Sequence, residues 1–240
     1  MLTKEEVKFI RSLHLKKFRK INNAFIIEGH KMIEEAIDSN SNCISKIYKS
    51  ENSELNIKTS LPILSIPEKQ LKQISTLKQP QGSLAICQNF ELEENTNSEL
   101  ILALDNIQDP GNFGTILRLA AWFGVKKVLA SHDCVELFNP KVVQASMGAI
   151  FNVSVKYLDL LDELKNCDLP IYGALLEGKS IYTASLPKKA VLIVGNEGNG
   201  ISESIKNKIQ YPLNIPKFGS GESLNVATAA GILLSEFMRL

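Results

Sequence analysis

Three stretches of the chain place glycines and polar side chains directly after apolar runs. They span 104–118 (LDNIQDPGNFGTILR), 193–201 (IVGNEGNGI) and 213–227 (LNIPKFGSGESLNVA). In open α/β sheets, ligands bind in the loops that follow the carboxyl ends of strands. Three such loops in one sheet therefore predict a ligand-binding site at that end, although they do not say which ligand it takes.

The candidates for chemistry are the polar side chains of these loops: Asn112, Arg118, Glu197, Ser223 and Asn225. Each also has a structural explanation, because Asn and Ser cap helices and charged side chains often lie on solvated faces. Ser223 fits the N-cap of a last helix over about 223–239, which would put Asn225 in its first turn. A helix over 115–123 would carry Arg118 in its second turn. The spacing alone leaves both explanations open.

A further motif is misleading. Residues 173–180 (GALLEGKS) match the phosphate-loop pattern G-x-x-x-x-G-K-[ST]. That site needs a loop followed by a helix whose N-terminus faces phosphate, whereas here β-rich sequence follows and ends at Pro187. A phosphate-loop NTPase is thus an alternative that the context disfavours. The chain has no G-x-G-x-x-G after a strand and no G-x-S-x-G, which disfavours dinucleotide binding and an α/β-hydrolase.

Composition narrows the class of protein. The 240 residues are 44% hydrophobic and 22% charged, which is ordinary for one large or two small globular domains. Lys and Arg number 27 against 26 Asp and Glu, so the net charge of +1 excludes a polycationic binder but not a local basic face. The four cysteines are widely spaced and there are three histidines, so we expect no disulfide framework and no metal site. The charged N-terminus and short apolar runs predict a soluble, cytoplasmic protein without a membrane helix.

The first 89 residues predict a small α/β domain. Thr3 and Glu6 form a capping box at the start of a helix over 3–20. Further helices are predicted over 30–37 and, with Pro67 at its first position, over 67–74. Strands are predicted over 24–28, 43–48, 62–66 and 83–87. Residues 90–99 (FELEENTNSE) are acidic and lack apolar periodicity, which predicts a linker.

A second domain is predicted over 100–240, where 12 of the 14 glycines lie. Apolar strands are predicted over 101–104, 127–130, 171–175 and 191–194, with helical patterns between them. Strands that alternate with helices indicate an α/β fold with a mostly parallel sheet covered on both faces.

The three loop stretches resemble the signature motifs of the SpoU-type RNA 2′-O-ribose methyltransferases of the SPOUT superfamily. They match N-x-x-D-P-x-N-x-G-x-x-x-R, G-N-E-G-x-G-I and I-P-x-x-x-x-x-x-S-L-N-V-A in order. The resemblance covers 101–240 strongly. More weakly, residues 25–31 (FIIEGHK) resemble the opening strand and turn of the small ribosomal-protein-like substrate-binding domain that often precedes this catalytic domain.

The resemblance implies a C-terminal trefoil knot, bound S-adenosyl-L-methionine (AdoMet) and a homodimer with sites at its interface. It assigns AdoMet contacts to Gly195, Ile215 and Leu224. It assigns catalysis to the five polar candidates, with Arg118 as activator of the ribose 2′-OH. A guanidinium with a pKa above about 12 is a poor base at rest. We therefore expect Arg118 to bind the adjacent phosphate and to lower the pKa of the 2′-hydroxyl. Asn112 and Ser223 would orient that hydroxyl, and Glu197 would hold the arginine or a partner loop.

The N-terminal segment fits an RNA substrate. Residues 1–31 contain eight Lys and Arg against three Glu, and a local basic helix is typical of phosphate contact. The predicted RNA-binding residues are Lys16, Lys17, Arg19 and Lys20; a solvated helix face is the alternative. The two-domain layout favours ribosomal RNA, with transfer RNA as the second choice. A catalytically idle RNA-binding protein is a further alternative, against which the intact Asn112, Arg118 and Asn225 argue.

Overall fold

The computed structural model describes residues 1–92 and 99–239. Its contacts divide the chain into two units, Met1–Glu91 with Glu136–Phe151 and Leu92–Val135 with Asn152–Leu240. The segment 136–151 thus packs with the first unit, although it falls inside the predicted domain 100–240. Most of the predicted linker, residues 93–98, lies outside the described residues.

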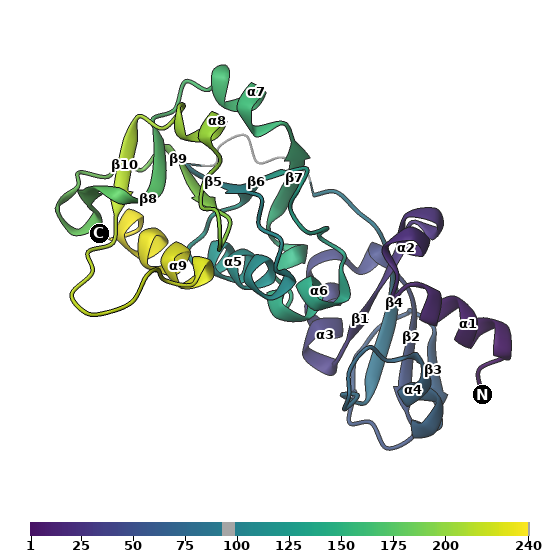
Figure 1. Cartoon of the computed structure of the whole chain (residues 1–240). Helices are drawn as coiled ribbons and strands as arrows, with labels where there is room; N and C mark the ends of the chain where they lie inside the picture. The colour runs from purple at the N-terminus through teal and green to yellow at the C-terminus, as the bar shows by residue number, and fades with distance from the viewer. Residues whose placement is uncertain (93–98, 240) are drawn as a thin grey trace. The chain divides into compact units, whose positions relative to one another are not determined.

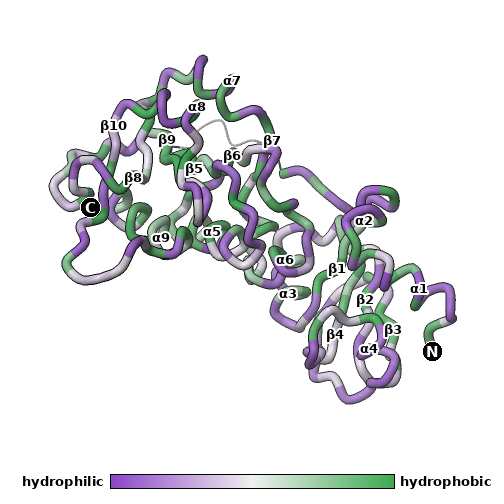
Figure 2. Tube along the Cα trace, viewed as in Figure 1, coloured by the Kyte–Doolittle hydropathy of each residue, from purple (hydrophilic) through white to green (hydrophobic). Residues whose placement is uncertain are grey.

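The first unit is a four-stranded mixed sheet with helices around it (Figure 1). The strand order is β1-β4-β2-β3, in which only β2 and β3 pair in parallel. Figure 2 shows the hydrophobic residues of β1 (green) inside this unit. The elements are α1 (Lys4–Ser12), α2 (Lys16–Asn22), β1 (Ala24–Glu28), α3 (His30–Asn40), β2 (Ile44–Ser50), β3 (Ile63–Ile66), α4 (Glu68–Ile74), β4 (Ser83–Gln88) and α6 (Pro140–Ser146).

The helix predicted over 3–20 is two helices. Its capping box is confirmed, since the Thr3 hydroxyl accepts from the Glu6 N–H and the Glu6 carboxylate accepts from the Thr3 N–H. The chain then turns at Leu13, whose buried side chain joins the core. Arg19 Nη1 donates to the Leu13 carbonyl at 2.8 Å, which satisfies a helix-end acceptor that the break exposes. Pro67, predicted at the first position of a helix, is the N-cap of α4 instead.

Aromatic rings join the segment 136–151 to this unit. Phe138 stacks on Phe25 with ring centroids 4.3 Å apart, and Phe90 packs against Phe138 and Phe151, each at 5.5 Å. Such pairs add about 0.5–1.5 kcal/mol beyond their buried area. Helix α6 in this segment was not predicted, although Asn139 followed by Pro140 is a helix-start signal.

The second unit is a six-stranded, fully parallel sheet in the order β10-β8-β9-β5-β6-β7. The four predicted strands and the parallel α/β class are confirmed; β7 was missed, although Val153, Val155 and Tyr157 alternate. The trefoil knot stays a prediction.

The elements of the second unit are β5 (Leu100–Asp105), α5 (Pro110–Trp122), β6 (Lys127–Ser131), β7 (Ser154–Leu158), α7 (Leu160–Lys165), β8 (Ile171–Ser180), β9 (Ala190–Gly195), α8 (Glu203–Lys206), β10 (Tyr211–Asn214) and α9 (Val226–Phe237).

The segment that matches a phosphate loop is extended strand. Residues 173–180 lie wholly within β8. A Cβ on Gly178 would lie 2.6 Å from the Pro212 carbonyl oxygen, so this glycine serves the approach of β10 to β8. The β-rich context expected from the sequence is confirmed, and a strand offers phosphate no cradle of N–H groups.

The described part of the chain offers neither a membrane span nor a metal cluster. None of its helices is long and apolar enough to cross a membrane. Within the same residues, no cluster of three or more His, Cys, Asp or Glu side chains could hold a metal ion.

Candidate active site

The loop after β5 ends at Asp109, the N-cap residue of helix α5, which begins at Pro110. The Asp109 carboxylate caps the helix by accepting from the Asn112 N–H at 2.8 Å, and Pro110 occupies the first turn. This start is five residues earlier than the predicted one at 115. Arg118 therefore lies in the third turn of α5 and not in the second.

Two side chains at and just after the end of β6 hold this loop, and neither was predicted from the sequence. Ser131 Oγ accepts from the Asn106 N–H at 2.9 Å, and Cys134 Sγ accepts from the Ile107 N–H at 3.2 Å. The Cys134 thiol also donates to the Leu104 carbonyl at 3.3 Å. Burial raises the pKa of Cys134, so the thiol keeps the proton that it donates. The signal that could have found them is position, since Ser131 directly follows a predicted strand at the ligand-binding edge.

The loop after β9 is tied to the same edge. Asn196 Nδ2 donates to the Asn106 carbonyl at 2.8 Å, and its Oδ1 accepts from the Gly198 and Asn199 N–H groups. A Cβ on Gly195 would lie 2.4 Å from the Gly200 carbonyl carbon, so only glycine lets the loop close on itself here. The loops after β5 and β9 are therefore fixed relative to each other.

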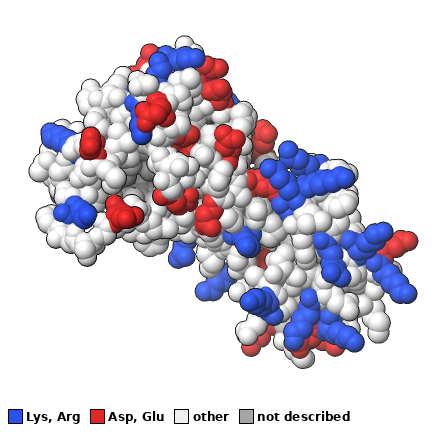
Figure 3. All heavy atoms as spheres, in the orientation of Figure 1, with Lys and Arg blue, Asp and Glu red and all other residues white. Residues whose placement is uncertain are grey.

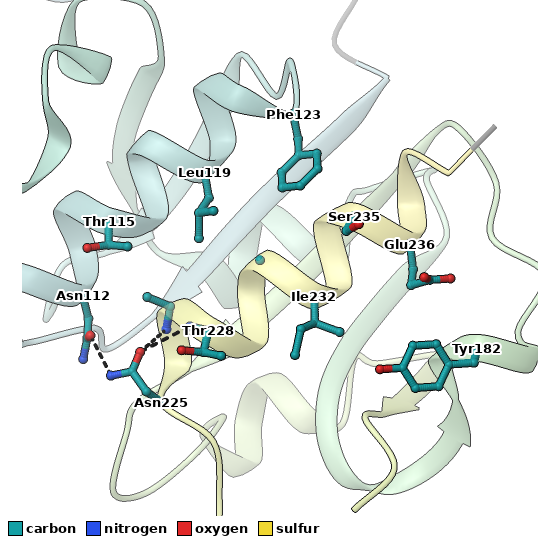
Figure 4. Close-up of a pocket in the computed structure, with 12 residues that line it drawn as sticks. Asn112, Thr115, Leu119, Phe123, Tyr182, Asn225, Thr228, Ile232, Ser235 and Glu236 are labelled. Atoms are coloured by element: carbon teal, nitrogen blue, oxygen red, sulfur yellow. Dashed lines mark hydrogen bonds between the residues drawn. The ribbon is translucent and has the colours of Figure 1, made fainter.

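A chain of hydrogen bonds then joins all three predicted loops. Asn225 Nδ2 donates to Asn112 Oδ1 at 2.9 Å (Figure 4). Asn112 Nδ2 in turn donates to Glu197 Oε1 at 2.7 Å. Asn225 Oδ1 is already occupied, because it caps α9 by accepting from the Ala227 and Thr228 N–H groups at 3.0 and 3.2 Å. The cap thus fixes the orientation of the Asn225 amide, which in turn fixes that of Asn112. We call Asn225, Asn112 and Glu197 the polar relay.

The predicted cap of the last helix is wrong. Asn225, not Ser223, is the N-cap of α9, which begins at Val226. Asn is as good a cap as Ser, so residue type could not separate two candidates two positions apart. Ser223 is exposed in the loop before the helix.

Because Asn225 has two roles, two substitutions should separate them. Asn225→Ala removes the cap and should cost about 0.5–2 kcal/mol of unfolding free energy, measured by urea denaturation. Asn225→Asp keeps a capping oxygen but loses the donor to Asn112, so stability should stay near wild type while any activity that depends on the polar relay falls. Equal stability of the alanine variant and the wild type would contradict the cap.

Arg118 stands apart from the polar relay. It is exposed on α5, and it makes no hydrogen bond or ion pair with any described residue. Six residues separate it from Asn112, which turns the two side chains about 120° apart around the helix. The expectation that Glu197 holds Arg118 is not met within this chain, since Glu197 accepts from Asn112.

A groove of about 610 Å³ runs between α5 and α9 (Figure 4). Asn112 and Asn225 lie at one end of it, and Ser235 and Glu236 line the other. Helices α5 and α9 are in ordinary van der Waals contact beside this groove, because a Cβ on Gly231 would lie 3.5 Å from the Leu119 side chain of α5. Trp122, the only tryptophan, is 83% exposed at the end of α5.

The loop between β10 and α9 carries two of the residues predicted to contact AdoMet, Ile215 and Leu224. Among the described residues, no backbone–backbone hydrogen bond involves 215–224, so its N–H and C=O groups are open to a ligand. Leu224 is 51% exposed and Ile215 is half-buried, which offers apolar surface for a purine. No atom lies within 4 Å of the Cβ positions of Gly219 and Gly221. Gly195 is half-buried and is the last residue of β9, so the three predicted cofactor residues lie at the end of β9 and in the loop after β10.

The predicted RNA-binding residues divide into two groups. Lys16, Lys17 and Lys20 are exposed, in a unit over which Figure 3 shows many Lys and Arg side chains. Arg19 is 3% exposed and ion-paired with Glu136, to which its Nε donates at 2.7 Å. It is therefore not available to RNA, and that prediction is corrected.

Arg19→Gln is accordingly expected to act on stability. Removing one partner of a buried ion pair costs about 3–5 kcal/mol, and we expect about 2–3 kcal/mol here because the Glu136 side chain keeps 19% exposure. Thermal unfolding of the variant beside Lys16→Gln measures the effect. Similar melting temperatures for the two variants would contradict the structural role of Arg19.

Comparison with known proteins gives a consistent family assignment. The profile of the SpoU rRNA Methylase family matches residues 99–235, and that of the MRM3-like substrate binding domain matches residues 4–85. The chain is 32% identical to the Bacillus subtilis 23S rRNA (guanosine(2553)-2′-O)-methyltransferase RlmP, over 96% of this chain and 94% of the relative.

Solved structures agree with this assignment. A TrmH-family protein from Porphyromonas gingivalis has a TM-score of 0.87 at 38% identity, covering 99% of this chain and 98% of that one. The AdoMet-bound rRNA methyltransferase from Sinorhizobium meliloti has a TM-score of 0.85 at 27% identity, covering 98% and 95%.

Proposed function

Because the chain belongs to the SpoU rRNA methylase family, we propose that it methylates the ribose 2′-OH of a guanosine in 23S ribosomal RNA. As a member of this family it is an AdoMet-dependent RNA 2′-O-ribose methyltransferase. The polar relay carries the proposal, since it joins one residue from each of the three motif loops. The choice of 23S rRNA rests on the relatives, which include the guanosine methyltransferases RlmP and RlmB.

AdoMet, when bound, supplies an electrophilic methyl group on sulfur. Gly195, Ile215 and Leu224 would hold it, through backbone groups and apolar surface. The protein's own task is to align the ribose 2′-OH and to favour loss of its proton. Asn112, which is hydrogen-bonded to both Asn225 and Glu197, would orient the hydroxyl or the phosphate beside it. Ser223, two residues before the cap, would add a hydroxyl donor.

Arg118 would supply the positive charge that the forming alkoxide needs. A guanidinium stays protonated, so it acts by electrostatic stabilisation and by gripping the adjacent phosphate in a bidentate manner. Its exposure and lack of partners among the described residues leave it free for this contact. Because Arg118 lies about 120° around α5 from Asn112 and makes no bond to the polar relay of its own chain, the relay it completes would belong to a second copy.

A homodimer is therefore part of the proposal. The groove between α5 and α9 would take the same face of the second chain in an isologous interface. The groove ends at Asn112 and Asn225. The exposed Trp122 is not one of its lining residues, but it follows the groove residue Thr115 by seven positions, which puts the two on the same side of α5. Each site would then combine residues of both chains.

The exposed lysines of α2 would contact RNA phosphates. Replacing Lys16, Lys17 and Lys20 together with Gln should weaken RNA binding and make it less dependent on salt. The slope of log affinity against log salt concentration should fall by about 0.7–0.9 for each phosphate that loses its lysine. AdoMet affinity should not change. The measurement is a salt titration of RNA binding, and an unaltered slope would place this face away from RNA.

The function is tested with purified protein, AdoMet and RNA from a strain that lacks the gene. Ribose methylation restored at one guanosine of 23S rRNA is the expected result. Methylation of transfer RNA alone would favour the second-choice substrate. RNA and AdoMet binding without methyl transfer would indicate an idle RNA-binding protein of the same fold.

A further inference from the structure

Helix α2 presents apolar side chains to solvent. Its buried position is taken by Arg19, whereas Leu15, Phe18 and Ile21 are 59%, 36% and 65% exposed. Side chains three positions apart are neighbours on a helix surface. Phe18 and Ile21 of α2 and the N-cap residue Leu15 therefore form one continuous row along the helix. We call these three residues the apolar stripe.

Cations border the apolar stripe. Lys17 lies one turn from Ile21, and its ammonium is 6.0 Å from the centroid of the Phe18 ring. Lys17 and Lys20 are exposed and form no ion pair within the described residues. Helix α2 itself (KKFRKIN) contains no acidic residue. A partner that satisfies this surface must offer a flat apolar face beside negative charge.

We propose that the apolar stripe, with Phe18 at its centre, is a stacking platform for an unpaired nucleobase of the RNA substrate. This inference rests on the proposed function and names the feature of the RNA that the N-terminal unit recognises. A nucleobase has two flat π-faces next to a phosphate, so Phe18 takes the base while Lys17 and Lys20 take the flanking phosphates. The Lys17 ammonium, now over the ring, turns to the phosphate when the base arrives.

Duplex RNA does not satisfy the same surface. Its bases are stacked on one another and present only edges and backbone, which the lysines bind but Phe18 does not. Stacking on an aromatic side chain contributes about 1–3 kcal/mol per base, or about 5- to 150-fold in affinity. The platform therefore discriminates single-stranded loops from continuous helices.

The test compares two labelled RNAs by fluorescence anisotropy: a stem capped by an unpaired loop, and the same stem as a blunt duplex. Phe18→Ala should weaken binding to the loop RNA by about 5- to 100-fold and leave duplex binding within about twofold. Its salt dependence should stay unchanged, because no cation is lost. Phe18→Trp should bind the loop RNA like the wild type. Phe9→Ala is the matched control, since Phe9 is 39% exposed on α1 outside the stripe.

Each other outcome has a defined meaning. Equal weakening of both RNAs by Phe18→Ala, or no weakening of either, overturns the platform. If Lys17→Gln also leaves the affinity for both RNAs unchanged, α2 does not contact RNA at all. This outcome separates the proposed RNA contact of the lysines from the proposed stacking on Phe18. If Phe18→Ala loses self-association in sedimentation velocity, the apolar stripe binds a second copy of the chain. If it loses binding to phosphatidylserine vesicles and keeps binding to RNA, the stripe binds a membrane. Either result overturns the inference. Unchanged circular dichroism excludes misfolding.

Discussion

Arg118→Ala is expected to lower the single-turnover rate of methylation by about 10²-fold or more, the scale of losing one preorganised electrostatic donor. AdoMet affinity should stay near wild type, because the residues proposed to hold AdoMet lie at the end of β9 and in the loop after β10, whereas Arg118 lies on α5. In the proposed mechanism Arg118 acts in the transition state, where the 2′-oxygen gains negative charge, so the loss should appear in the rate and not in cofactor binding. Saturating RNA and AdoMet isolate the chemical step.

Two controls sharpen this prediction. Arg118→Lys keeps the charge but loses the planar fork, so it should not restore the rate. Lys188→Ala removes an exposed cation elsewhere in the same unit and should leave the rate within about twofold. Near-normal turnover of Arg118→Ala would remove this residue from the mechanism. Rescue by lysine would reduce its role to a point charge.

The site shows what local sequence patterns could predict. Apolar runs that become β5 and β9 predicted where the loops begin, because a strand buried on both faces needs a continuous apolar segment. The contact between Asn112 and Glu197 could not be predicted, since 85 residues separate them and an amide direction decides it. That direction follows from the cap at Asn225, a role that the sequence pattern had suggested for Ser223.

Arg19 is a residue whose role the sequence predicted wrongly. In the sequence it is one of four basic residues within five positions, and nothing local separates it from its neighbours. Its burial depends on Glu136, which is 117 residues away and reaches the first unit through the segment 136–151. A cluster of like residues therefore predicts a basic face, but the folded chain decides which member is turned inward.

The second large effect concerns the groove between α5 and α9. Ser235→Arg should weaken dimerisation by at least about 100-fold and reduce methylation to a similar extent. In an isologous interface the substitution occurs twice, and juxtaposed like charges in a desolvated interface cost several kcal/mol. Ser235 is exposed near the C-terminus of α9, where a cation suits the helix dipole, so the single chain should fold normally.

The position of Ser235 makes the result informative. Ten residues of helix, or about 15 Å, separate it from Asn225, so lost activity cannot come from direct contact with the polar relay. Emission from the exposed Trp122 should shift to the red as the dimer dissociates, and light scattering should report the mass. Ser204→Arg, an exposed serine on α8 outside the groove, should stay dimeric and active. A wild-type chain that is monomeric at micromolar concentration yet active would show that one chain forms a complete site, and Arg118 would then have to reach the relay of its own chain.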